Sequence, residues 1–187
     1  MVRSTHTLAI KSQKWILESL LDLMNRKSYD EITVTEICKN AQLDRRTFYR
    51  NFKDKDDVME FYIATLQSEF LATLKYVKVR TIHSMAKAQF DFWKEHLEFL
   101  LALHKNNILM SLILKVTNEF IPTIYTEFHE QIPSNFQYKS AFIIGGFCNI
   151  LFHWLSTGAK ESSDEIAKIV SELFDDNNPY WSSYIQN

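Results

Sequence analysis

Glycine and proline are scarce in this chain of 187 residues, which contains three of each. Together they make up about 3% of the sequence, where about 12% is usual. Tight turns between β-strands depend on such residues, so their scarcity argues against a sheet or a barrel. Disorder is excluded as well, because 46% of the residues are hydrophobic and 14% are aromatic. The composition therefore predicts an all-α fold.

Cysteine is also rare, and the motifs that carry enzyme chemistry are missing. Cys38 and Cys148 lie in apolar stretches and are expected to be reduced core residues, not a disulfide. The sequence has no paired Cys or His spacing typical of a metal site, no phosphate-binding glycine loop and no Gly-x-Ser-x-Gly motif. We therefore expect no metal, no cofactor and no enzyme activity. The polar N-terminus lacks an apolar signal core, which predicts a cytoplasmic protein.

Charged residues are absent from 140–159, a stretch long enough to span a bilayer. Asn149 and His153 would be costly in lipid, so a helix buried on all sides is favoured over a membrane span.

Charge is concentrated in one part of the chain, although the net charge is only −2. Residues 39–55 contain six basic and two acidic residues, the only strong focus of charge in the chain.

Apolar residues repeat at helical spacing along almost the whole sequence. Capping boxes are expected at Thr33–Glu36, Ser134–Gln137 and Ser162–Glu165, and single caps at Asp44 and Asp54. Pro122 is expected to kink or split the helix that contains it. The predicted helices cover about 7–27, 33–41, 44–52, 54–74, 81–93, 95–104, 107–131, 134–158 and 162–176.

The third predicted helix carries the basic focus. Arg45, Arg46, Tyr49 and Arg50 fall within about 140° of one another around its axis, while Phe48 and Phe52 lie on an apolar side. Such a helix can be anchored by its rings and can present guanidinium groups to a DNA major groove. The alternative is a solvated basic face on an ordinary small bundle, and charge alone would favour it.

The stretch from 33 to 55, TVTEICKNAQLDRRTFYRNFKDK, resembles the TetR family of one-component transcriptional regulators. The resemblance is close over about 8–62, and Thr47, Phe48, Tyr49, Phe52 and Lys55 occupy positions of the family motif. It implies a helix-turn-helix DNA-binding domain over 1–53, and a helical effector-binding and dimerisation domain over 54–187. The implied function is ligand-responsive control of transcription, most often repression, by a homodimer on a palindromic operator in double-stranded DNA. The residues expected to contact DNA are Thr33, Thr35, Arg45, Arg46, Thr47, Tyr49, Arg50 and Lys55.

Three positions depart from the family pattern. Ser28 and Gln42 stand where many members have glycine, and Asn51 where many have His or Tyr. We expect Gln42 to force its turn into a backbone conformation that glycine adopts at lower cost, and Asn51 to remove one phosphate contact. These departures favour a rival interpretation, a ligand-sensing co-regulator of the same fold that acts through protein contacts and does not bind DNA.

The rest of the chain is expected to supply a ligand pocket and a dimer interface, both largely on the strength of the resemblance. No carboxylate is clearly committed to the interior, so an apolar or aromatic effector is predicted, oriented by Tyr125, His96 or Asn118. The expected pocket residues are Phe90, Trp93, His96, Phe99, Asn118, Phe120 and Tyr125. The expected interface residues are Phe147, Leu151, Trp154, Ile166, Ile169, Val170 and Leu173.

Overall fold

The computed structural model describes residues 2–79, 81–128 and 132–174. Within these residues the chain forms nine α-helices and one short 3-10 helix, and no strand, as the composition predicts. The elements are α1 (Val2–Arg26), η1 (Tyr29–Glu31), α2 (Val34–Asn40), α3 (Arg45–Asn51), α4 (Lys55–Lys75), α5 (Ile82–Glu95), α6 (Leu97–Lys105), α7 (Leu109–Phe128), α8 (Phe136–Ser156) and α9 (Ser163–Glu172).

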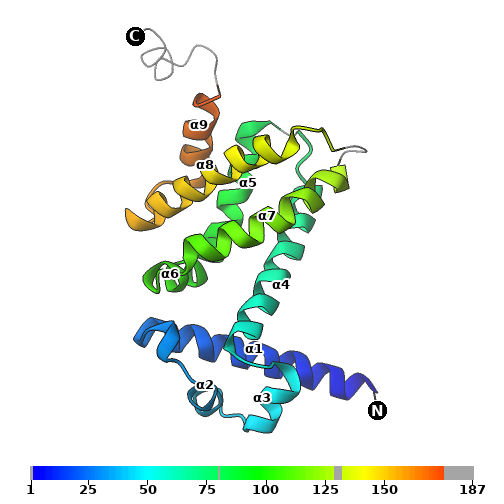
Figure 1. The fold of residues 1–187 in the computed structure, drawn as a ribbon, viewed down its shortest axis with the longest axis vertical. Coiled ribbons are helices and arrows are strands. Elements are labelled where there is room, and N and C mark those ends of the chain that lie inside the picture. The colour runs from blue at the N-terminus through cyan, green and yellow to red at the C-terminus, as the bar shows by residue number, and fades with distance from the viewer. Residues whose placement is uncertain (1, 80, 129–131, 175–187) are drawn as a thin grey trace.

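Helices α1 to α3 form a head at one end of the molecule, and α4 rises from it into a body made of α5 to α9 (Figure 1). The head has a continuous apolar core. Its fully buried side chains are Ile16, Leu20 and Met24 of α1, Ile37 of α2, Phe48 of α3 and Val58 at the start of α4. Burial of these side chains holds α1, α2 and α3 to one another and to the base of α4 through the hydrophobic effect.

The body contains two helix pairs, one member of each pair contacts α4, and α6 contacts both pairs. Helix α5 packs against α9, and α7 packs against α8. The rings of Phe90 (α5) and Trp154 (α8) meet edge to face, with centroids 5.6 Å apart, and the Trp154 indole N–H donates to the Glu161 carbonyl at 3.1 Å. This arrangement satisfies the polar atom of a buried tryptophan while its ring fills the core.

The cap signals are correct at four helices and wrong at one. Thr33 and Ser162 form the capping boxes expected of them, and Asp44 and Asp54 cap α3 and α4. Helix α8 instead begins after Asn135 with no side-chain cap, so the box expected from Ser134 is absent. Helix α5 begins with a Thr81–Ser84 box that the sequence analysis did not anticipate. Helix α7 passes through Pro122 without being split.

Helix α8 contains the uncharged stretch, and one of its sides is exposed. Ile144, Cys148 and Leu151 are buried in the protomer, whereas Tyr138 and Phe142 are 84% and 66% exposed. Burial on all sides is thus a wrong prediction for the single chain. Over the described residues, no helix combines the length and the apolar character that crossing a membrane requires.

Candidate DNA-binding surface and effector cavity

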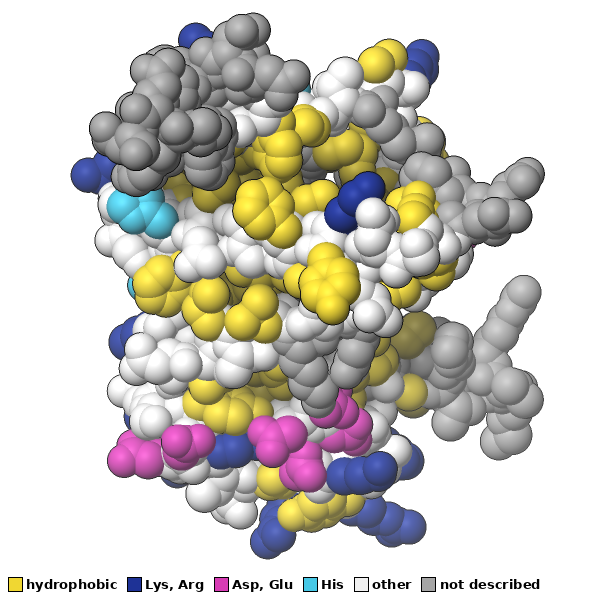
Figure 2. Space-filling view, turned by 45° about the horizontal axis from the view of Figure 1, so that its top comes forward, with side chains coloured by type: hydrophobic (Ala, Val, Ile, Leu, Met, Phe, Trp, Pro, Cys, Tyr) yellow, Lys and Arg dark blue, Asp and Glu magenta, His cyan; other side chains and the backbone are white. Residues whose placement is uncertain are grey.

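Helix α3 is anchored by one aromatic side and exposes the other. Phe48 is completely buried and Phe52 nearly so, and their rings pack on each other with centroids 6.1 Å apart. The opposite side exposes Arg45, Arg46 and Arg50 together with Tyr49, which is 51% exposed. Figure 2 shows Lys and Arg side chains at the lower edge of the molecule, where the head lies.

The exposed side of α3 is shaped as well as charged. The Arg45 guanidinium donates to the Tyr49 hydroxyl at 3.2 Å and lies 5.6 Å from the centre of its ring. Arg46, Thr47, Tyr49 and Arg50 border a shallow hollow with Asp44. Asp44 accepts from the Thr47 amide, which lowers the pKa of its carboxyl, and it remains an anionic helix cap. Five predicted DNA contacts, from Arg45 to Arg50, therefore share one accessible surface.

The N-cap and first turn of α2 carry two further predicted DNA contacts, Thr33 and Thr35. Thr33 and Thr35 are exposed, but the Thr33 hydroxyl is committed to a capping box with Glu36. The Glu36 carboxylate also accepts two hydrogen bonds from the Lys27 ammonium, at 2.8 and 2.9 Å. These bonds, with those from Thr33, lower the pKa of Glu36 to about 2.

The ammonium of Lys55 is engaged within the protein. Its ammonium donates to the carbonyl oxygens of Tyr29, Asp30 and Ile32 at 2.6 to 3.2 Å and lies 4.5 Å from the centre of the Tyr29 ring. An ammonium has three donors, and all three are used inside the protein. This geometry argues against the predicted phosphate contact and makes Lys55 the clamp that holds the η1 segment to the base of α4.

The three residues that depart from the family pattern, Ser28, Gln42 and Asn51, differ in their backbone conformation and contacts. Gln42 has φ of +55°, as expected for a position where many members have glycine. Ser28 has φ of −59°, so nothing in its backbone calls for glycine. The Asn51 amide donates to the Thr47 carbonyl of its own helix at 2.8 Å. One of its amide donors is thus used within α3.

A large cavity lies inside the body between α4, α5, α7 and α8. Its volume is about 360 Å³, comparable to small-molecule sites of ~300–1,000 Å³. Its wall is almost entirely apolar, and it is called the wide chamber below. The lining side chains are Phe70, Leu74, Thr81, Ile82, Met85, Gln89, Phe90, Trp93, Ile113, Ile121, Ile143, Ile144, Phe147, Cys148, Leu151 and Phe174.

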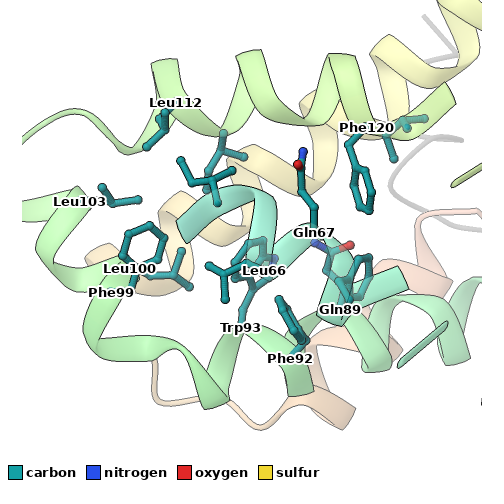
Figure 3. A pocket seen from close by; sticks show the side chains of 14 residues that line it. Leu66, Gln67, Gln89, Phe92, Trp93, Phe99, Leu100, Leu103, Leu112 and Phe120 are labelled. Atoms are coloured by element: carbon teal, nitrogen blue, oxygen red, sulfur yellow. The ribbon is translucent and has the colours of Figure 1, made fainter. Parts of the chain in front are cut away.

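A second hollow of about 70 Å³, the narrow chamber, adjoins the first between α4, α5, α6 and α7. Figure 3 shows Phe99, Leu100 and Leu103 of α6 along one part of its wall and Phe120 of α7 along another. Phe70, Gln89, Trp93, Ile113 and Ile121 line both chambers. The two hollows therefore adjoin along these five side chains, and together they are called the cavity below.

The cavity wall includes the predicted residues Phe90, Trp93, Phe99 and Phe120 but not the three expected polar ones. His96 joins α5 to α6, where its ring packs on Phe92 and faces Tyr62 and Glu69. Asn118 is exposed on α7, and the Tyr125 ring packs on Phe136 of α8. The wall's polar side chains are instead Gln67, Gln89 and Thr81. Gln89 could have been found in the sequence, because it precedes Phe90 and lies four residues before Trp93.

The predicted dimer-interface residues divide into buried and accessible groups. Leu151, Trp154, Ile166 and Val170 are buried in the core of the single chain. Ile169 is 49% exposed, and Phe147 and Leu173 are half-buried. A groove of about 460 Å³ between α8 and α9 joins the last two to apolar neighbours: Phe142, Ile143, Gly146, Ile150, Val170 and Phe174.

A three-helix head with an exposed basic recognition helix, joined to a helical body with an apolar cavity, defines a helix-turn-helix transcriptional regulator. The family models agree with this class. Residues 16–60 match the bacterial regulatory proteins of the tetR family, and residues 80–176 match a transcriptional regulator C-terminal region. The chain belongs to the TetR family, and it is a ligand-responsive, DNA-binding transcriptional regulator.

Individual relatives are distant. The HTH-type dhaKLM operon transcriptional activator DhaS of Lactococcus lactis is 32% identical over 53 residues, which span 28% of either chain. A TetR transcriptional regulator from Streptococcus agalactiae has a similar fold, with a TM-score of 0.65 and 16% identity over 94% of this chain and 99% of its own. The fatty acid degradation regulator FadR from Bacillus halodurans has a TM-score of 0.55 and 15% identity over 87% and 93%.

Proposed function

We propose that the chain is a cytoplasmic homodimeric repressor that leaves a palindromic operator when an apolar or aromatic molecule occupies its cavity. The exposed surface of α3 reads the major groove, and the two heads bind half-sites about 34–36 Å apart. An effector that fits only one arrangement of the heads shifts the population away from the DNA-bound state.

The observation that carries this proposal is the position of α6. One side of α6 supplies Phe99, Leu100 and Leu103 to the narrow chamber. At its C-terminal end, Asn106 accepts from the Tyr29 amide at 2.7 Å and donates to the Met24 carbonyl at 3.1 Å. Lys105 donates to the Asn25 carbonyl beside it. A single short helix therefore touches both the ligand space and the base of the head.

The DNA half of the proposal is tested by gel shift and anisotropy with the DNA upstream of the chain's own gene. Arg46→Ala should weaken binding by about 1–3 kcal/mol and relax the choice of one base pair, because arginine forks read guanine. Tyr49→Phe should weaken binding similarly on all sequences by removing a phosphate contact. With about six to eight phosphates neutralised per dimer, log K against log salt should have a slope of about −5 to −7. Tight binding without salt dependence would contradict a groove-bound α3.

The effector half is tested at Trp93, which lines both chambers. Naphthalene and biphenyl compounds that release the DNA should quench tryptophan fluorescence. Trp93→Ala should change their potency and leave DNA affinity without ligand nearly unchanged, because Trp93 lies in the body. Equal potency on both proteins would place the effector outside the cavity.

A further inference from the structure

The junction of the two chambers holds a polar side chain in an apolar wall. Gln89, on the inner side of α5, lines both chambers, and its neighbours at the junction are Phe70, Trp93, Ile113 and Ile121. In Figure 3 the Gln89 side chain points into the cavity, as does that of Gln67 from α4. No described residue makes a hydrogen bond to the Gln89 amide.

Charge is missing from this wall. The described residues that line either chamber include no Asp, Glu, Lys, Arg or His. The nearest charged pair on α5 is Lys87 with Asp91, joined at 2.6 Å, and neither belongs to the lining. A carboxylate or an ammonium brought into the cavity would lose hydration and meet no counter-ion among the described residues of the wall, which is strongly unfavourable.

An uncharged polar group, in contrast, has a hydrogen-bonding partner in this wall. A glutamine amide offers two donors and an acceptor, so it can pair with an amide, a hydroxyl or a ketone. Because α5 packs against both α4 and α9, its backbone fixes where that amide can reach. In an apolar wall, one such hydrogen bond orients a ligand and distinguishes it from an apolar molecule of the same shape.

We infer that the effector is an uncharged molecule whose apolar body fills the wide chamber and whose neutral polar group hydrogen-bonds to Gln89 at the junction. This rests on the proposed function in placing the effector inside the cavity. It goes further in excluding free organic acids and amines as ligands and in assigning recognition to one side chain.

Four probes with a common ring system test the inference by titration calorimetry: naphthalene, 2-naphthamide, 2-naphthoate and 2-naphthylmethylammonium. On the unaltered protein, 2-naphthamide should bind at least about tenfold more tightly than either ion, since each tenfold is ~1.4 kcal/mol. Gln89→Leu should keep naphthalene binding and lose the preference for 2-naphthamide over naphthalene. Gln89→Glu should raise the affinity for the ammonium relative to the amide by supplying a counter-charge, whereas Gln137→Glu, on the exposed side of α8, should leave every affinity unchanged.

The outcomes separate this inference from the proposed function when operator binding is measured with the same probes. Tightest binding by 2-naphthoate, or an unchanged amide preference in Gln89→Leu, overturns the uncharged ligand while the cavity remains the effector site. Binding of 2-naphthamide through Gln89 with no effect on operator affinity supports the inference and contradicts ligand-controlled repression. Absence of binding by all four probes overturns the cavity as a ligand site and this inference with it.

Discussion

Gln42 occupies the turn between α2 and α3 with a backbone that disfavours side chains. Its φ of +55° costs an L-residue roughly 1 kcal/mol more than glycine. Gln42→Gly should therefore raise the free energy of unfolding by about 0.5–1 kcal/mol, as measured by urea denaturation. As a control, Gln13→Gly within α1 should lower it by about 0.5 kcal/mol, because glycine is a poor helix former. Equal effects of both substitutions would show that the turn is not strained.

Glu36 links the first turn of α2 to the end of α1 through Lys27, and it makes the head sensitive to acid. Hydrogen bonds from Lys27 and Thr33 lower its pKa from 4.5 to about 2 in the folded chain. The contribution to stability is therefore complete above about pH 4.5 and disappears as the pH falls toward 2.

Glu36→Gln should accordingly reduce the free energy of unfolding at neutral pH, and the difference from the unaltered chain should shrink between pH 4.5 and 2. Urea denaturation across this range measures it. Glu18→Gln provides the control, because Glu18 is exposed and its ion pair with Lys14 is long, at 3.7 Å. A difference that persists unchanged at pH 2 would show that the carboxylate charge is not responsible.

At the scale of elements, α6, like α4, has contacts on both the cavity and the head. Asn106→Ala would leave the Tyr29 amide and the Met24 carbonyl without their partner, at a cost of about 1–3 kcal/mol in the free energy of unfolding. Because the cavity wall is unchanged, probes such as 2-naphthamide should bind with the same affinity but should no longer release the operator fully. Asn118→Ala, on the exposed side of α7, is the matched control and should behave like the unaltered chain. Full release by the probe in the Asn106 variant would place the coupling in another element.

The elements of the head were predictable from the sequence because their signals are local. Caps at Thr33, Asp44 and Asp54 lie within three residues of what they bind, and the apolar spacing of each helix gives its buried side. The role of Lys55 was not predictable, since its partners lie 23 to 26 residues earlier and come together only in the folded head. The sequence predicted the aromatic residues of the cavity wall on α5 to α7. It did not predict the polar residues of the wall, because their positions depend on how α4, α5 and α7 face one another.

At the scale of the whole molecule, the proposed homodimer needs a surface for a second copy, and the exposed apolar side of α8 with the α8–α9 groove is the candidate (Figure 2). Phe142→Glu should place an unpaired carboxylate in that interface and give monomers in sedimentation velocity. Operator binding should be lost with it, because one head reaches one half-site. Tyr76→Glu is the control, since Tyr76 is 85% exposed at the end of α4 and does not line the groove. A Phe142 variant that remains dimeric would place the interface elsewhere.

Helix α8 separates the cavity from this surface, together with Phe174 beyond the end of α9. Ile143 and Phe147 of α8 line the wide chamber and also line the groove between α8 and α9. A substitution at either position alters the shape offered to a ligand and the shape offered to a partner subunit at once. If two copies pair through this groove, effector choice and subunit pairing cannot drift independently in evolution. Paralogues that acquire a new effector through these positions would then also tend to stop forming mixed dimers with their parent, which would insulate the two regulatory circuits from each other.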